Sequence, residues 1–81
     1  MNNTILAFKA SWCQPCKNMA PVLEVIDPTR LIQYDIDEHR DLVDKYEIRA
    51  VPTFVVLGSV GSEINRFLGQ QPRSKFESYL G

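Results

Sequence analysis

Two cysteines separated by two residues stand in the segment SWCQPCK, where they occupy positions 13 and 16. They are the only cysteines in the chain. A Cys-x-x-Cys pair can exchange electrons with another disulfide, supply two ligands to a metal, or close a structural bridge. These uses differ in what the rest of the chain must provide, so the surrounding residues decide between them.

A metal site needs ligands beyond the two cysteines. Zinc takes four ligands, and in addition to the pair the chain offers only His39 and carboxylates. A structural zinc is therefore disfavoured, whereas an iron–sulfur cluster shared between two chains through Cys13 and Cys16 stays open as a secondary property. His39 is most simply a solvated surface residue, and capping and solvation account for Asp35 and Asp37.

Length and charge limit the classes of function. The 81 residues suffice for one domain, residues 1–81, and nine basic against ten acidic residues give a formal net charge of −1. No basic cluster occurs in the sequence. This balance argues against nucleic acid or an acidic membrane surface as a partner, because both are recognised through a basic surplus or a basic patch.

The first residues, MNNTILAFKAS, lack the charged start and the long apolar run of a signal peptide. No apolar stretch approaches the roughly 20 residues of a membrane span. We therefore expect a cytoplasmic protein without a membrane partner. Cytoplasmic thiols stay reduced, so a Cys-x-x-Cys pair there favours catalysis or metal binding over a structural bridge.

The first half of the chain predicts a strand followed by a helix. Residues 4–9, TILAFK, form an apolar run typical of a buried strand. The helix is expected to end near Asp27, because Pro28 disfavours helical geometry in the residue before it. Apolar residues at helical spacing after the strand are Cys16, Met19, Ala20, Leu23 and Ile26.

The second half predicts two more helices and three strands. Residues 31–36 form a strand, and Asp37 is expected to cap a short helix. Residues 53–57 and 63–67 form two strands joined by the turn segment GSVGS, and Pro72 suits the first position of a last helix. The buried stripes of the two helices are Leu42, Val43 and Tyr46, and Phe76, Tyr79 and Leu80.

The predicted order is strand, helix, strand, helix, strand, strand, helix. The opening strand-helix-strand unit implies a parallel pair, and the closing hairpin adds antiparallel strands. The expected fold is therefore α/β, a four-stranded mixed sheet flanked by helices. In such sheets a site tends to form where the carboxyl end of the first strand meets a helix N-terminus, which is where the two cysteines fall.

This placement gives the two thiols different roles. Cys13 stands at the strand-to-helix turn, where backbone N–H groups and the helix dipole favour the reactive thiolate. Cys16 follows one turn later on the same side and is expected to be more buried. Cys13 is therefore the predicted attacking thiol and Cys16 the resolving one. Pro15 falls in the first turn, where it costs no helical hydrogen bond and stiffens the loop between the sulfurs.

Several motifs together resemble the thioredoxin superfamily, over residues 5 to 80. They are the hexapeptide WCQPCK, Pro21 within CKNMAPVLE, the segment YDID, Pro52 within YEIRAVPT, and Gly69. The resemblance implies a thioredoxin-like fold, a redox-active disulfide between Cys13 and Cys16, no bound cofactor, and reduction of disulfides in protein substrates. NADPH-dependent thioredoxin reductase is then the expected electron source, ribonucleotide reductase a plausible client, and a monomer the expected state.

The resemblance also implies a docking surface beside the cysteines. The peptide bond between Val51 and Pro52 should be cis, the form that proline tolerates, and should face the cysteine pair. Because Pro52 has no N–H group, the backbone of Val51 is left to pair with an extended substrate. Trp12, Val51, Pro52 and Gly69 would form an apolar surface around Cys13.

The sequence departs from the family pattern at four positions. The buried aspartate six residues before the first cysteine is Ala7, and the lysine that accompanies it is Gln33. Water or a substrate group must then accept the proton of the second cysteine. Gln14 replaces the usual glycine, and Lys9 replaces an aromatic residue and is expected to stabilise the thiolate of Cys13 if it points that way. The chain also starts late, without the family's first strand and helix, which resembles the compact glutaredoxins.

Two other functions stay open. Glutaredoxins usually carry a tyrosine between the cysteines and a Gly-Gly-acid segment, whereas this chain has Gly69-Gln70-Gln71, so a glutathione-dependent redoxin is the runner-up. A different class is an interaction subunit with thioredoxin fold and dispensable cysteines. The two cysteines together with Pro15 and Pro52 favour catalysis, because a scaffold needs none of them.

Overall fold

The computed structural model describes residues 3–80, so the first two residues and the last residue of the predicted domain 1–81 lie outside the described part. The seven predicted elements are present in the predicted order. The strands and helices are β1 (Thr4–Lys9), α1 (Gln14–Glu24), β2 (Leu31–Asp35), α2 (Arg40–Lys45), β3 (Thr53–Leu57), β4 (Glu63–Leu68) and α3 (Arg73–Leu80).

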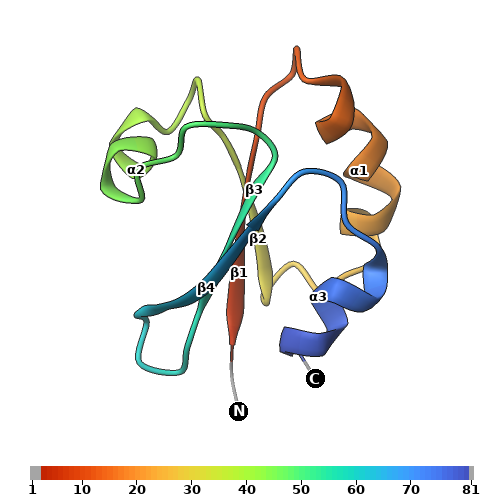
Figure 1. Cartoon of the computed structure of the whole chain (residues 1–81), viewed down its shortest axis with the longest axis vertical. Helices are drawn as coiled ribbons and strands as arrows, with labels where there is room; N and C mark the ends of the chain where they lie inside the picture. Colours follow the sequence, from red (N-terminus) through yellow and green to blue (C-terminus); the bar gives the residue numbers. More distant parts are fainter. Residues whose placement is uncertain (1–2, 81) are drawn as a thin grey trace.

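The four strands form one mixed sheet in the order β2-β1-β3-β4. β1 pairs with β2 in parallel, and β3 pairs with β1 and β4 in antiparallel fashion, which confirms the predicted fold class. Helices α1 and α3 cover one face of the sheet and α2 lies against the other (Figure 1). In the parallel pair, Ala7 of β1 lies opposite Gln33 of β2.

The larger part of the core lies between the sheet and the helices α1 and α3. Three phenylalanine rings form its centre, with centroids 4.8 to 5.4 Å apart. Burial of such rings supplies a large share of the hydrophobic stabilisation of a small domain. The residues of this cluster are Ile5, Ala7, Met19, Leu23, Leu31, Phe54, Val56, Phe67, Phe76 and Leu80.

Helix α1 ends earlier than the sequence predicts. The helix stops at Glu24 and Val25 caps it, rather than near Asp27. The carboxylate of Asp27 accepts hydrogen bonds from the backbone N–H and the hydroxyl of Thr29, at 2.9 and 2.7 Å. Such local bonds offer the backbone an alternative to the helix, and here they shape the turn that leads into β2.

The starts of α2 and α3 also differ from the prediction. Asp37 does not cap α2: the helix begins at Arg40 after His39, whose side chain makes no capping bond. Instead, the N–H of Asp37 donates to the carboxylate of Asp35 at 2.8 Å, so both residues belong to the turn after β2. Pro72 lies one residue before α3 and not at its first position, and its carbonyl accepts the N–H of Lys75.

Three connections meet at one end of the sheet, at the top of Figure 1. They are the segment from β1 to α1, the segment entering β3, and the segment from β4 to α3. This arrangement brings the cysteine motif, the Val51–Pro52 bond and Gly69 to the same end. None of the helices described in residues 3–80 is long and apolar enough to cross a membrane.

Candidate active site

Cys13 occupies the N-cap position of α1. Its backbone is extended, with φ −92° and ψ 111°, and its carbonyl accepts the N–H of Lys17 at 3.1 Å. Its sulfur accepts the backbone N–H of Cys16 at 3.2 Å. Pro15 lies in the first turn, where its missing N–H leaves no helical bond unmade. The helix N-terminus therefore directs the N–H of Cys16 toward the Cys13 sulfur, an arrangement that favours a thiolate there.

The two cysteines are joined as a disulfide, with their Cα atoms 5.2 Å apart. The sequence predicts that Cys16 is the more buried of the pair, and this prediction is wrong, because each residue is 6% exposed. The two cysteines differ instead in the neighbours that they face. Cys13 lies beside the segment that enters β3, whereas Cys16 lines a cavity between α1 and the sheet.

The peptide bond between Val51 and Pro52 is cis, as expected. The carbonyl oxygen of Val51 lies 3.7 Å from the Cys13 sulfur, so a reduced Cys13 can direct its thiol toward that carbonyl. The carbonyl of Pro52 accepts the N–H of Gly69 at 3.0 Å. Gly69 has a φ of 78°, a conformation that glycine adopts without steric cost, and this turn holds it next to Pro52.

Trp12 lies on the surface beside the disulfide. It is 65% exposed, and its indole N–H donates to the carboxylate of Asp37 at 3.2 Å. The sequence reasoning missed this role of Asp37, although the spacing within YDID already placed the carboxylate just past the end of the second strand. A groove of about 320 Å³ adjoins the tryptophan, and its lining residues are Trp12, Ile36, Ile48, Arg49, Ala50 and Val51.

Gln14 points away from the sulfurs. Its amide donates to the side chain of Asn18 at 3.0 Å, and Asn18 donates to Gln70 at 3.2 Å. These bonds form an exposed chain from the first turn of α1 to the segment after β4. Gln14 therefore lies at the border of the site, where it connects two of the segments that meet there.

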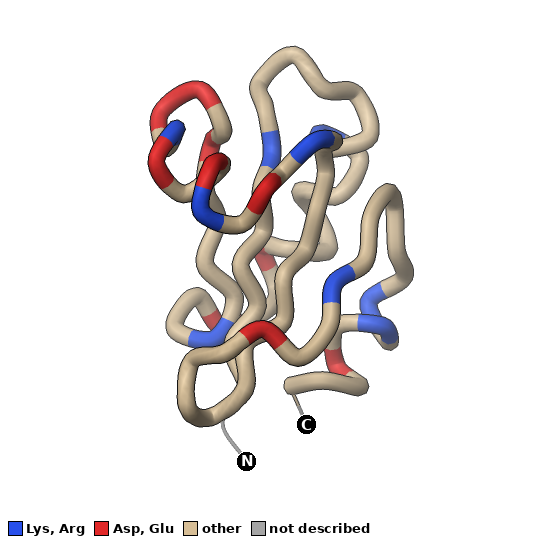
Figure 2. The backbone as a smooth tube through the Cα atoms, turned by 60° about the vertical axis from the view of Figure 1, so that its left-hand side comes forward, with Lys and Arg blue, Asp and Glu red and all other residues tan. Residues whose placement is uncertain are grey.

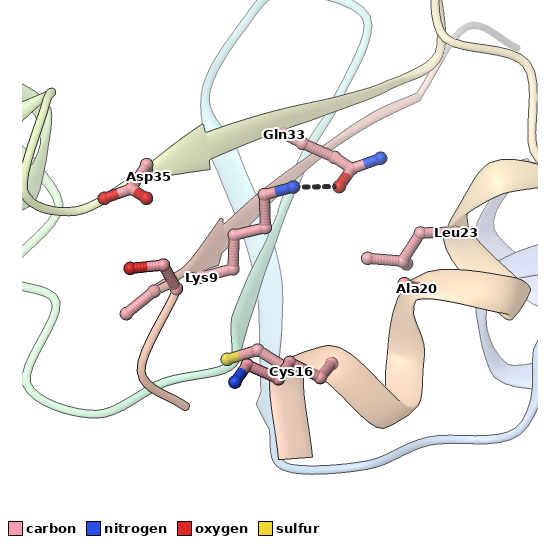
Figure 3. Close-up of a pocket in the computed structure, with 9 residues that line it drawn as sticks. Lys9, Cys16, Ala20, Leu23, Gln33 and Asp35 are labelled. Atoms are coloured by element: carbon pink, nitrogen blue, oxygen red, sulfur yellow. Dashed lines mark hydrogen bonds between the residues drawn. The ribbon is translucent and has the colours of Figure 1, made fainter. Parts of the chain in front are cut away.

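Lys9 lines a cavity beside Cys16. Its ammonium donates to the side-chain oxygen of Gln33 at 2.8 Å, as Figure 3 shows. Both residues line a cavity of about 350 Å³ together with Cys16. The expected contact of Lys9 is with Cys13, but the structure places Lys9 in the cavity that Cys16 lines, because its position on β1 faces α1. Ala7, on the same face of β1, is 1% exposed.

The remaining candidate residues lie outside the site or in its surroundings. The ring of His39 packs against the edge of Tyr34, with centroids 4.9 Å apart. Asp35 and Asp37 begin an acidic segment that runs through α2 (Figure 2). Within residues 3–80, no three His, Cys, Asp or Glu side chains are grouped so that they could hold a metal ion.

The resolved pKa shifts lie away from the cysteines. Hydrogen bonds from the backbone and side chain of Thr29 lower the pKa of Asp27 below its ordinary value of 3.8. At the start of β4, hydrogen bonds from the guanidinium of Arg66 lower the pKa of Glu63, and the same bonds raise the pKa of Arg66. These carboxylates stabilise the turn before β2 and the β3–β4 hairpin, and they lie away from the cysteine site.

A disulfide at the head of the first helix, on a four-stranded sheet of this order, defines the class of proteins with the thioredoxin fold. The family model described as Thioredoxin matches residues 1–81. The mitochondrial thioredoxin of Bos taurus is 33% identical in an alignment 81 positions long, which covers 94% of this chain and 48% of the relative. A thioredoxin of Staphylococcus aureus (strain Mu50 / ATCC 700699) is 32% identical, and the match covers 94% of this chain and 77% of that relative.

The solved structures agree. A mutant thioredoxin from Halobacterium salinarum NRC-1 has a TM-score of 0.85 and 29% identity, covering 99% of this chain and 76% of that one. Oxidised mitochondrial thioredoxin 3 from Saccharomyces cerevisiae has a TM-score of 0.80 and 33% identity, with 96% and 76% covered. The chain belongs to the thioredoxin family. It spans about half the length of the mammalian mitochondrial relatives that it matches.

Proposed function

We propose that this protein is a thiol–disulfide oxidoreductase that reduces disulfides in other proteins. One observation carries the proposal: Cys13 caps the N-terminus of α1, beside the Val51 carbonyl, and Cys16 is close enough to form a disulfide with it. The helix N-terminus favours the thiolate that starts the exchange. Membership of the thioredoxin family supports the same activity.

The reaction has two exchange steps. The Cys13 thiolate attacks one sulfur of the client disulfide, and the other client sulfur leaves as a thiolate that takes a proton from solvent. Cys16 then attacks the Cys13 sulfur of the mixed disulfide and releases the second client thiolate. Two electrons pass to the client, and Cys13 and Cys16 end as the disulfide seen in the structure.

The client is proposed to dock on an apolar surface around Cys13. Trp12 exposes most of its surface there, and the backbone N–H of Gly69 donates a hydrogen bond to the carbonyl of Pro52. Large exposed aromatic side chains next to a reactive group are typical of contact surfaces. An extended client segment would lie along Val51. Pro15 would support this surface by holding the first turn, and Gln14 would lie at its border.

We also propose how the disulfide is reduced again. No bound cofactor is needed, because a partner supplies the electrons, and NADPH-dependent thioredoxin reductase is the proposed source, in line with the family. Ribonucleotide reductase is a plausible client, the cytoplasm the proposed compartment and a monomer the proposed state. Several relatives are named as mitochondrial proteins, so the compartment needs its own test by fractionation.

The test is reduction of the disulfides of insulin with two electron supplies in parallel, one with NADPH and thioredoxin reductase and one with NADPH, glutathione and glutathione reductase. We expect turnover with the first supply and none with a Cys13→Ser variant. Turnover mainly with the second supply would make the protein a glutaredoxin in function. Failure with both supplies and with a chemical dithiol would overturn the proposal in favour of an interaction subunit.

A further inference from the structure

Cys16, and not Cys13, lines the cavity behind the disulfide. It has a volume of about 350 Å³ and lies between α1 and the ends of β1 and β2, as Figure 3 shows. A water molecule occupies roughly 30 Å³ in the liquid, so the cavity has room for several. Water in this cavity would therefore lie beside the second cysteine, which lines it.

Three ionisable side chains besides Cys16 line this cavity, one from each element around it. They are Lys9 of β1, Lys17 of α1 and Asp35 of β2. Lys17 is exposed to solvent, which screens its charge. The Asp35 carboxylate accepts the N–H of Asp37 and so belongs to the turn after β2.

Lys9 differs from Lys17 in burial and from Asp35 in the sign of its charge. Its residue is only partly exposed, as is that of Asp35, and the side-chain oxygen of the exposed Gln33 accepts a hydrogen bond from its ammonium at 2.8 Å. Gln33 is neutral, so this bond fixes the ammonium without cancelling its charge. Ala7, the neighbour of Gln33 across the parallel strands, has no ionisable group. The charged groups that line the cavity beside Cys16 are therefore two ammoniums and one carboxylate, which leaves a surplus of one positive charge.

From this arrangement we infer that Lys9 is a positioning residue for the resolving step, in which its fixed positive charge stabilises the thiolate of Cys16. The inference rests on the proposed function and deepens it. The Cys16 thiol gives its proton to water in the cavity, its sulfur attacks the Cys13 sulfur of the mixed disulfide, and the client sulfur leaves as a thiolate that takes a proton from solvent. No carboxylate base is needed, because the ammonium favours the ionised sulfur.

The first measurement is the ionisation of Cys16 in a Cys13→Ser background, followed by the ultraviolet absorbance of the thiolate. Lys9→Met keeps the apolar stem and removes the charge, and it should raise the pH of half-ionisation by ~0.5 to 1 unit. At a pH below the midpoint this is about a three- to tenfold loss of thiolate. Lys9→Arg should stay close to the parent, and Lys17→Met, the matched control at the rim, should shift the midpoint less.

The second measurement is the dithiol–disulfide equilibrium in glutathione buffers, with both cysteines present. Above the half-ionisation pH, Lys9→Met should move the equilibrium about three- to tenfold toward the disulfide, because the dithiolate state loses its stabilising charge. Well below that pH the thiols are neutral and the difference should vanish. A packing defect would persist at low pH, so the pH dependence separates the charge from a structural effect.

An unchanged Cys16 midpoint in Lys9→Met would overturn the inference, as would an equal shift in Lys17→Met. If Lys9→Met loses its far-ultraviolet circular dichroism, Lys9→Gln takes its place with the same expected shift. Neither measurement uses a client or a reductase. The two proposals can therefore fail separately. If the protein reduces no client but Lys9→Met still shifts the ionisation of Cys16, the proposed function is wrong and the effect of the Lys9 charge stands.

Discussion

Cys13 and Cys16 carry the same thiol, and their different roles come from where α1 places each. The N-cap position gives Cys13 the N–H of Cys16 and the Val51 carbonyl as neighbours. One turn later, Cys16 lines a cavity together with two lysines and one carboxylate, that of Asp35 in the turn after β2. At the scale of single residues, the proposed order of attack therefore follows from position in the helix.

The order of attack predicts different fates for the two serine variants. Cys16→Ser should form the mixed disulfide with a client and fail to resolve it, so a stable covalent complex accumulates. Cys13→Ser should form no such complex. Non-reducing electrophoresis and mass spectrometry after incubation with oxidised insulin distinguish the two. Accumulation of the complex in Cys13→Ser would reverse the assigned roles.

Asp27 predicts a pH dependence of stability. Its folded-state pKa lies below the ordinary 3.8, so the carboxylate contributes stability that is complete above that value and is lost as the pH falls through the folded pKa. Asp27→Asn keeps an oxygen for the Thr29 N–H and removes the titration. The wild type should exceed this variant in the free energy of unfolding near neutral pH, and the difference should close in acid.

Urea denaturation followed by circular dichroism at a series of pH values measures this difference. Glu24→Gln serves as a control, because it removes an exposed carboxylate at the end of α1, three residues before Asp27. A gap between wild type and Asp27→Asn that stays constant down to the most acidic pH would show that the carboxylate does not titrate with folding.

At the scale of elements, the site depends on the segments between strands and helices rather than on any one of them. Helix α1 presents the cysteines, the segment entering β3 presents Val51, and the turn after β4 presents Gly69 (Figure 1). Each segment is held by a local bond, such as that from the hydroxyl of Thr53 to the carbonyl of Ala50 at 2.6 Å. Changes in these segments should therefore affect activity more than stability.

Two glycines with positive φ allow a matched test of this idea. Gly69 has φ 78° beside the site, and Gly61 has φ 85° in the distant β3–β4 turn. An added Cβ would meet no atom within 4 Å at either position, so the cost of alanine is the strained backbone alone, about 1 kcal/mol.

We expect Gly69→Ala and Gly61→Ala to lose similar free energy of unfolding, and only Gly69→Ala to slow insulin reduction, because its turn lies against Pro52. Urea unfolding and the turnover assay on the same samples give both numbers. Equal activity losses in the two variants would mean that stability, and not the docking surface, limits turnover.

At the scale of the whole molecule, a small domain has little stability to spare. Folded domains are stable by about 5–15 kcal/mol, and the core here consists of two clusters on either side of one sheet and a small third cluster at the cysteines. The cysteine pair closes a short loop, with a sequence separation of 3, so its effect on the unfolded chain is modest. The chain-entropy model gives about 2 kcal/mol for a loop of this size.

Reduction of the disulfide should therefore lower the free energy of unfolding by about 2 kcal/mol and leave the slope against urea nearly unchanged. Urea denaturation with and without a chemical dithiol measures both quantities. The Cys13→Ser, Cys16→Ser double variant is the control, because the dithiol should not affect it. A reduced protein as stable as the oxidised one would mean that the folded dithiol gains compensating interactions.

Much of this molecule could be predicted from residue types and spacing. The alternation of apolar runs and helical stripes determined the order of the seven elements, and the resemblance of the AVPT segment predicted that Val51 and Pro52 lie beside the cysteines. Boundaries were predicted less well. Local side-chain bonds of Asp27 and Asp35 ended one helix early and delayed the next, and such competition depends on geometry that a periodic pattern does not contain.

The sequence by itself determined that Cys13 and Cys16 stand at a strand-to-helix turn, because that depends on the order of residues along the chain. Only the tertiary structure decided which way Lys9 faces, since its direction follows from the alternation of β1 against α1 and from the bond to Gln33 across the sheet. The equal burial of the two cysteines was likewise decided by packing. Contacts between residues distant in the chain exist only after folding, so the charge beside Cys16 is a property of the assembled sheet and helix.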